Sequence, residues 1–233
     1  GPKKDTGATS YLPVNLLTGK RTDSYAGTKD DTDYFLSFDE LTDSAVKVEI
    51  LDEEGVWQEK KEGFSVDTVL GKVHFDTAPG ESPLEGEDNV RITYEVEDYA
   101  DRIDGCSCAV LYGVNGAMDR VFLTGHPEYP NIDRWSAFED PAYFADTDYS
   151  VLGSEGCAIA GYSIVAGMLA AHKDGEENGR NVFIRQGTLT SSGEAQFLIY
   201  DVVQAENAVA PRSFQSAMGE PMFLTRRGVF ALT

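Results

Sequence analysis

Apolar side chains recur at every second residue through most of this chain, which is the pattern of half-buried β-strands. In the clearest run, Val90, Ile92 and Tyr94 alternate with polar or charged neighbours. Segments with the 3.6-residue period of an amphipathic helix are scarce. One apolar and one charged face per strand is typical of antiparallel sheets that cover a core on one side. We therefore expect an all-β protein.

The strands fall into two blocks with different textures. The first block alternates cleanly between Asp- and Gly-rich turns and predicts a small β-sandwich domain, with strands at 34–38, 46–50, 64–66, 73–75 and 90–96. In the second block the strands are more continuously apolar and glycines separate them. Its expected strands are 109–112, 120–124, 149–152, 159–165, 168–172, 181–185, 196–202, 212–215, 221–224 and 229–232.

The second block contains an internal repeat. Two stretches, 162–172 and 221–232, share the order strand, glycine turn, strand, and Val110–Thr124 is a weaker third copy. The turn glycines Gly113, Gly167 and Gly228 are 167 − 113 = 54 and 228 − 167 = 61 residues apart. Repeats of about this length with about four strands each are typical of β-propeller blades. Because a propeller closes with four or more blades, about two to three blades predict a partial ring. Such a ring is either a piece of a longer protein or one that other copies complete.

Charge restricts the partners of the chain. It carries 40 Asp and Glu against 19 Lys and Arg, a formal net charge of −21. Nucleic-acid backbones and anionic membrane surfaces are bound by clustered cations, so neither sequence-specific nucleic-acid binding nor membrane binding is expected. No apolar run is long enough to span a membrane.

Cysteine usage indicates synthesis in a reducing compartment. Cys106, Cys108 and Cys157 are odd in number and lack the spacing of a disulfide framework. With three scattered histidines they also lack zinc-site spacing, so we expect no metal and no cofactor. The acidic turns 30–33 and 52–55 lack EF-hand spacing but leave a bound calcium open.

Residues 119–153 form an acidic and aromatic segment that predicts a contact element. Pro127, Pro130 and Pro141 restrict the backbone there, which suits a rigid loop. Its aromatic side chains either fold back to cap a blade or anchor a joint between subunits. These candidate interface residues are Tyr129, Trp135, Phe138, Tyr143 and Phe144.

The segments 119–125 (DRVFLTG), 140–144 (DPAYF) and 149–153 (YSVLG) resemble, in this order, a string found in tailed-bacteriophage and prophage structural proteins. These are the β-propeller head-to-tail connector, or tail-stabilisation, proteins. Residues 15–21 (NLLTGKR), 112–116 (YGVNG) and 177–187 extend the likeness, which covers most of 11–25 and 99–233.

The resemblance implies a partial propeller made of residues 11–25 and 99–233, with an immunoglobulin-like sandwich, 26–98, inserted into it. Residues 1–10 are expected to be a tag remnant, Gly1-Pro2, and a flexible start. The implied protein is made in the cytoplasm of the bacterial host and resides in the virion. It works without catalysis, by contacts with other virion proteins and copies of itself. An acidic lining would let DNA slide past it.

Two other function classes stay open. The sandwich domain could present a ligand face as a carbohydrate-binding or adhesion module. The propeller could be a glycosidase, with Asp140 and Asp148 among its carboxylates. The sialidase-type Ser-x-Asp-x-Gly-x-x-Trp box is absent from the sequence, and Gly153-Ser154-Glu155-Gly156 lacks the spacing of a hydrolase nucleophile elbow.

Overall fold

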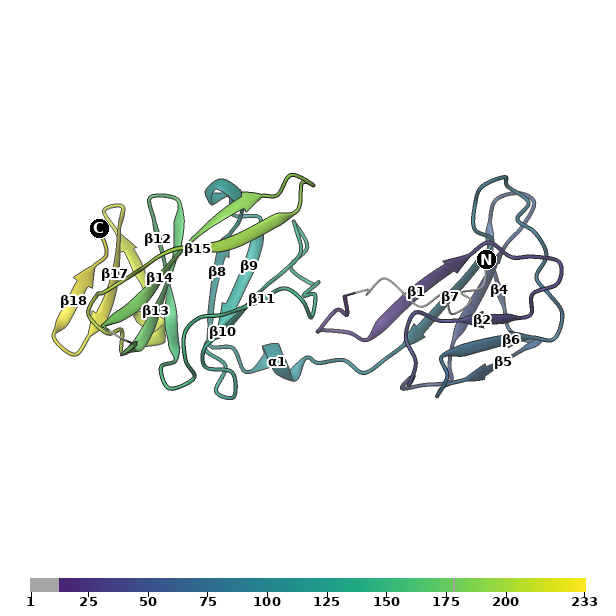
Figure 1. The fold of residues 1–233 in the computed structure, drawn as a ribbon, viewed down its shortest axis with the longest axis horizontal. Helices are drawn as coiled ribbons and strands as arrows, with labels where there is room; N and C mark the ends of the chain where they lie inside the picture. Colours follow the sequence, from purple (N-terminus) through teal and green to yellow (C-terminus); the bar gives the residue numbers. More distant parts are fainter. Residues whose placement is uncertain (1–12, 178) are drawn as a thin grey trace. The chain divides into compact units, whose positions relative to one another are not determined.

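A computed structural model describes residues 13–177 and 179–233, and the prediction for residues 1–10 lies outside this range. The expectation of an all-β chain is confirmed: five antiparallel sheets form in the described part, and none closes on itself (Figure 1). The only α-helix among the described residues is one turn, α1 (Asp101–Asp104). No helix in this range is long and apolar enough to cross a membrane.

The described chain divides into two compact units. We call residues 18–98 the N-terminal unit, and residues 15–17 with 99–233 the C-terminal unit. The division differs from the expected boundaries, because β1 (Lys20–Tyr25) was expected in the domain of residues 99–233. It pairs instead with β7 (Val90–Glu95) in the N-terminal unit.

The N-terminal unit consists of two sheets that share one core. Their strand orders are β1-β7-β3-β4 and β2-β6-β5. Tyr34 and Phe75 lie between them with ring centroids 5.2 Å apart, edge to face. The remaining strands are β2 (Asp33–Phe35), β3 (Lys47–Leu51), β4 (Trp57–Lys60), β5 (Phe64–Asp67) and β6 (Lys72–Phe75).

A buried carboxylate explains why β1 belongs to this unit. Asp23 on β1 accepts hydrogen bonds from the hydroxyls of Tyr25 (3.2 Å) and Tyr94 (3.1 Å). The backbone N–H of Ser37 donates to the same carboxylate at 2.6 Å, and the Ser37 hydroxyl donates at 2.8 Å. Because a buried carboxylate without partners is costly, these four donors hold β1 in the N-terminal unit.

The C-terminal unit contains three sheets in chain order. The first has the order β11-β10-β9-β8, the second β12-β13-β14-β15 and the third β16-β17-β18. Two 3₁₀ turns, η1 (Val114–Gly116) and η2 (Pro211–Ser213), complete the unit. The strands are β8 (Cys108–Tyr112), β9 (Arg120–Thr124), β10 (Ile132–Trp135), β11 (Tyr149–Val151), β12 (Ile159–Val165), β13 (Met168–Glu177), β14 (Arg180–Leu189), β15 (Ala195–Val203), β16 (Gln215–Ala217), β17 (Glu220–Thr225) and β18 (Gly228–Ala231).

The three sheets are stacked with the second in the middle. Phe122 on β9 and Phe197 on β15 meet at 4.9 Å in the core between the first and second sheets. Ala160 on β12 and Phe223 on β17 pack together between the second and third sheets. Two of the four sheet faces at these junctions therefore belong to the second sheet, which is covered on both sides.

Several local predictions are wrong. The stretch between the expected strands 120–124 and 149–152 is not all loop, because β10 lies inside it and pairs with both β9 and β11. The expected strand 212–215 overlaps the turn η2 at residues 212 and 213, and of its four residues only Gln215 belongs to a strand, β16. In the repeat, Gly113 is extended (φ −162°), and the left-handed turn residues are Asn115 (φ 54°) and Gly116 (φ 78°). The copy at 221–232 is also out of phase with the other two, since β17 and β18 are the second and third strands of their sheet.

Candidate functional site

The five aromatic residues predicted as an interface do not form one patch. Trp135 stacks on Phe122 in the core between the first and second sheets, at 5.5 Å. Phe144 is buried on the opposite face of the first sheet, against Leu16 and Ile103. Both side chains therefore pack in the core. This is the arrangement expected if the aromatic residues of this segment fold back to cap a blade.

The other three predicted residues lie nearer the surface. Tyr129 is half-buried against His126, with ring centroids 5.0 Å apart, and Tyr143 is also half-buried. Phe138 is the most exposed of the five, at 59%, and the Arg120 guanidinium lies 5.3 Å from its ring centroid. Of the predicted set, only Phe138 presents most of its ring for a partner, and its interface role stays a prediction.

A buried ion pair links the first and second sheets. The Arg185 guanidinium donates to Asp133, and the Tyr162 hydroxyl donates to the same carboxylate oxygen at 3.1 Å. Neither charged side chain is exposed, and Arg185 lies over the rings of Phe122 and Trp135 at 5.3 and 5.4 Å. Burial on this scale makes the pair a structural connection, since removing one partner would leave an uncompensated charge.

Ser163 and His172 form a second buried pair, at the junction of the second and third sheets. The serine hydroxyl and Nε2 of the imidazole lie 2.9 Å apart. His172 also contacts the rings of Phe214 and Phe223, at 5.0 and 4.5 Å. Burial lowers the pKa of His172 to about 4, so the ring is neutral at pH 7. Its Nδ1 has no partner among the described residues, whereas a base in a catalytic triad is oriented there by an acid.

The other titratable candidates have ordinary structural surroundings. Asp140 is exposed and accepts a turn hydrogen bond from the Ala142 N–H at 3.0 Å. Burial raises the pKa of Asp148, and the nearby Asp146 raises it further. Burial also raises the pKa of Cys106 to about 11, so this thiol is protonated and unreactive at neutral pH.

Metal binding finds no support in the described ranges, where no group of three His, Cys, Asp or Glu is placed to hold an ion. In the acidic turn 52–55, Asp52 accepts hydrogen bonds from the N–H groups of Glu54 (3.0 Å) and Val56 (2.8 Å) and from the Gln58 amide (2.9 Å). These donors lower the pKa of Asp52, and the carboxylate caps its own turn.

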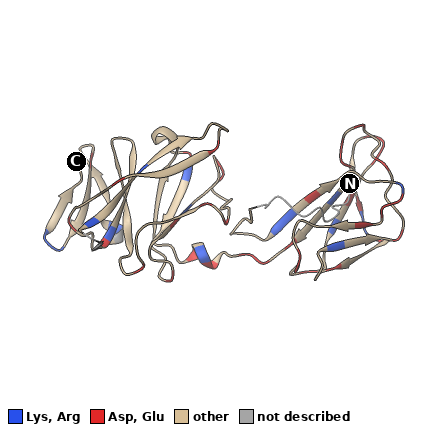
Figure 2. Cartoon of the chain, in the orientation of Figure 1, with Lys and Arg blue, Asp and Glu red and all other residues tan. Residues whose placement is uncertain are grey.

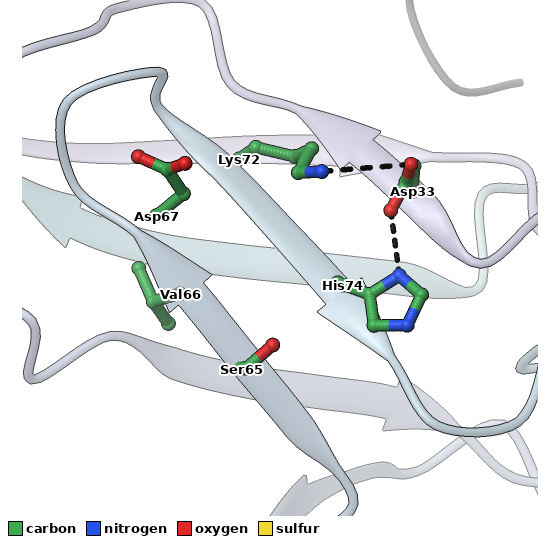
Figure 3. A pocket seen from close by; sticks show the side chains of 6 residues that line it. All are labelled: Asp33, Ser65, Val66, Asp67, Lys72 and His74. Atoms are coloured by element: carbon green, nitrogen blue, oxygen red, sulfur yellow. Dashed lines mark hydrogen bonds and ion pairs between the residues drawn. The ribbon is translucent and has the colours of Figure 1, made fainter.

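The N-terminal unit has a polar hollow of about 420 Å³ on the outer face of the β2-β6-β5 sheet (Figure 3). Asp33 and His74 are cross-strand neighbours, and the Asp33 carboxylate lies 2.6 Å from Nδ1 of the imidazole. The ammonium of Lys72 lies 3.6 Å from the other carboxylate oxygen. Ser65 and Asp67 on β5 complete the floor, so three strands contribute charged or hydroxyl groups to one face.

The C-terminal unit instead exposes an apolar edge strand. On β15, Leu198 is 58% exposed and Tyr200 69%, with Ile199 between them also exposed. The pairing of β14 with β15 shifts register here, because Arg185 pairs with Ile199 while Ile184 pairs with Asp201. In the sequence, no Lys or Arg occurs between Arg185 and Arg212. An edge strand of this kind is a surface on which another strand can pair.

No protein-family model matches this chain, and no curated protein sequence was found to be similar to it. The geometry is therefore the guide to function. The apolar edge at β15 is the feature that the sequence analysis missed. Its signal was the run Leu198-Ile199-Tyr200, three apolar residues in a strand where alternation would leave one of the two faces polar.

Proposed function

We propose that this chain is a structural component of a tailed-bacteriophage virion. It acts in head–tail connection or tail stabilisation through protein–protein contacts, without catalysis, together with other virion proteins. The observation that carries the proposal is the exposed apolar edge strand β15, with Leu198 and Tyr200 mostly in solvent. Single exposed apolar residues are common on any protein, but three in succession on an edge strand favour a protein contact.

Two further observations support this function. The segments 119–125, 140–144 and 149–153 carry the resemblance to phage connector proteins, and all three lie in the first sheet or its connecting loop. The C-terminal unit also contains two four-stranded antiparallel sheets and one of three strands, and this supports its interpretation as a partial β-propeller. In this proposal the N-terminal unit is an inserted immunoglobulin-like sandwich, and the protein resides in the virion.

The test is the protein content of purified phage particles. Particles induced from a bacterial strain that carries this gene would be banded by density and analysed by mass spectrometry. We expect peptides of both units, at a constant copy number per particle and enriched with the portal and tail proteins. Absence of the chain from intact particles, with the protein present in the lysate, would refute the proposal.

The hollow of Figure 3 favours a second candidate, a carbohydrate-binding module. Carboxylate, imidazole and ammonium groups on one open face can bind sugar hydroxyls, and the exposed Phe35 lies on the same sheet. A glycan array would separate the two functions. Binding that is lost in Asp33→Ala and His74→Ala but kept in Lys29→Ala, whose side chain is exposed elsewhere in the unit, would favour the module.

A further inference from the structure

Arg134 is a buried cation on the outer face of the first sheet. Its neighbour on β10, Asp133, points toward Arg185 in the second sheet, so Arg134 points the other way. Only 6% of Arg134 is exposed, and Nη1 of its guanidinium is fully enclosed. Tyr149 is its cross-strand partner on β11, and the guanidinium lies 5.1 Å from the centroid of that ring. The ring therefore covers a face of the guanidinium and leaves the N–H groups at its edge.

This guanidinium has no acceptor in the part of the chain that the structure describes. The side chain of Arg134 makes no hydrogen bond or ion pair with any described residue, and Nη1 is a buried polar atom without a partner. In the same unit, Arg120, Arg185 and Arg227 each pair with a carboxylate. Buried charges in proteins are almost always paired, because an uncompensated charge is costly away from water. In a chain with 40 Asp and Glu, this exception indicates that the anion comes from another molecule.

A second arginine lies beside Arg134. Arg102 on α1 is half-buried, and its guanidinium lies 4.1 Å from the centroid of the Tyr99 ring. Among the described residues it also has no hydrogen bond or ion pair. Burial lowers the pKa of Arg134, and the charge of Arg102 lowers it further. The groups that act in the opposite direction are a thiol and two phenols, those of Cys106, Tyr149 and Tyr129. No carboxylate of the described chain acts on this charge, so two cations lie together without an anion.

Contacts within the C-terminal unit hold the two arginines in place. Ile103 on α1 is buried in a small core that packs on Leu123, the cross-strand partner of Arg134. Nε2 of His126 lies 2.7 Å from the carbonyl oxygen of Asp101, so the loop after β9 is fixed to α1. The helix and the strand that carry the two guanidinium groups are therefore fixed relative to each other. A preorganised pair of this kind binds an anion with a smaller loss of side-chain entropy.

We propose that Arg134 and Arg102 form a binding site for a single carboxylate group of another molecule. A planar guanidinium matches a carboxylate through two parallel N–H···O hydrogen bonds. A polyanion such as DNA fits less well, because the exposed Asp101, Asp104 and Glu128 lie beside the site residues in the sequence and would repel it. The inference goes beyond the proposed function. An acidic side chain of another protein and a small organic acid both supply this chemistry.

NMR of the arginine side chains of the full chain tests the site. At pH 7, sodium acetate should shift the Nε–H signal of Arg134 saturably, with half-saturation on the order of 10 mM, whereas sodium chloride at equal ionic strength should not. Arg134→Gln identifies the signal and should weaken acetate binding at Arg102 at least about tenfold. The matched control is the signal of Arg91, which should not shift. This guanidinium also lies over a ring, that of Trp57 at 4.3 Å, but it is already paired with Glu49.

A second variant and a second measurement keep the test independent of folding. Arg134→Lys keeps the charge but loses the two parallel donors, so it should bind acetate more weakly than the wild type. Both variants should keep the circular dichroism melt of the wild type, because removing an unpaired cation leaves no buried anion behind. In the wild type, acetate should raise the melting temperature of the C-terminal unit above its value in chloride, since only the folded chain has the site.

A capped peptide, acetyl-Ala-Glu-Ala-amide, distinguishes the two sources of the carboxylate. Tighter binding of the peptide than of acetate indicates an acidic side chain of a protein, and equal or weaker binding indicates a small acid. The absence of a saturable shift with both probes, or equal binding by Arg134→Gln, would overturn the inference. Tighter binding of duplex DNA than of acetate would also overturn it and assign the site to phosphate. None of these results bears on the proposed function, which the protein content of purified particles decides.

Discussion

The two units of this protein differ in the charge of their edge strands. All four edge strands of the N-terminal unit, β1, β2, β4 and β5, contain charged residues. In the C-terminal unit the described edge strands are β8, β11, β12, β15, β16 and β18, and among them only β15 has a charge, Asp201. Figure 2 shows this contrast, with coloured residues on the strands of one unit and mostly tan strands in the other.

Net charge follows the same division. Residues 18–98 carry 8 Lys and Arg against 22 Asp and Glu, so 8 − 22 = −14, whereas residues 99–233 carry 9 against 17, so 9 − 17 = −8. Charged edges and strong like charge prevent strands of different molecules from pairing. The comparison indicates that the N-terminal unit is protected against association and that the C-terminal unit is the part suited to contacts with other proteins.

The largest expected effect tests whether the units are also separate in stability. Arg185→Leu leaves Asp133 buried without its cation and should destabilise the C-terminal unit by about 3–5 kcal/mol. In urea unfolding followed by circular dichroism and by tryptophan fluorescence, the transition of the C-terminal unit should move to lower urea. The transition of the N-terminal unit should not move.

The matched control is Lys29→Leu, which removes the exposed partner of the exposed Glu81 in the N-terminal unit. Exposed pairs contribute about 0–1 kcal/mol, so its effect should be several times smaller. If Arg185→Leu shifts both transitions equally, the units do not unfold independently and the comparison fails.

Acid should weaken the two units in different pH ranges. The folded-state pKa of His172 is about 4, below the unfolded value of 6.5, so the unfolded chain binds a proton that the folded chain does not. The stability of the C-terminal unit should therefore be complete above pH 6.5 and fall as the pH decreases to about 4, by about 3 kcal/mol. His172→Phe should remove this dependence.

In the N-terminal unit the relevant groups are carboxylates. A hydrogen bond from His74 lowers the pKa of Asp33, and hydrogen bonds from Arg91 and Lys47 lower that of Glu49. Their contribution is present above the unfolded pKa values of 3.8 and 4.5 and is lost below them. Thermal melts between pH 3 and pH 7 should show the C-terminal unit responding first. A simultaneous response would contradict the assignment to His172.

A smaller effect is expected from substitutions that make a charged edge strand apolar or an apolar edge strand charged. Glu59→Val on β4 gives the N-terminal unit an apolar edge, and Leu198→Lys on β15 gives the C-terminal unit a charged one. Each should change unfolding stability by no more than about 0.5 kcal/mol. Light scattering during heating should show earlier aggregation for Glu59→Val and later aggregation for Leu198→Lys. The reverse order would mean that the edges do not control association.

The smallest expected effect is on DNA. With a net charge of −21 the chain should not retard duplex DNA in a gel, even at low salt where phosphate contacts are strongest. That result would agree with the proposed role beside the path of DNA, where a duplex slides without adhering. Clear retardation of DNA by the C-terminal unit alone would show that this unit has a cationic surface, which its net charge of −8 does not indicate.

The alternation of apolar and polar residues predicted most strands of this fold. A strand with one face on the core and the other in solvent has an apolar residue at every second position. The prediction failed where polar groups are buried. In β10 the core positions are taken by Asp133, whose cation Arg185 lies far away in the sequence, so no local pattern marks the strand. The position of β1 likewise depends on Asp23 and its distant donor Tyr94.

The interface residues show the same limit. Aromatic residues such as Trp135 and Phe144 look alike in the sequence, whether they fill a core or contact a partner. What distinguishes them is the sheet that packs over them, and this depends on tertiary structure. In β15, by contrast, the sequence itself contains the signal. Leu198-Ile199-Tyr200 are three successive apolar residues, and no Lys or Arg lies near them to protect an edge strand.

The chain leaves and re-enters the C-terminal unit at neighbouring points. Tyr99 donates its N–H to the carbonyl of Leu16 at 3.2 Å, and Leu16 donates its own N–H to Phe144 at 2.7 Å. Within the N-terminal unit, the Val96 N–H donates to the Gly19 carbonyl at 3.0 Å. Residues 18–98 therefore behave as a cassette with adjacent ends, which can be cut out and the gap sealed by a short linker. Evolution could have exchanged this cassette for another without rebuilding the scaffold that carries it.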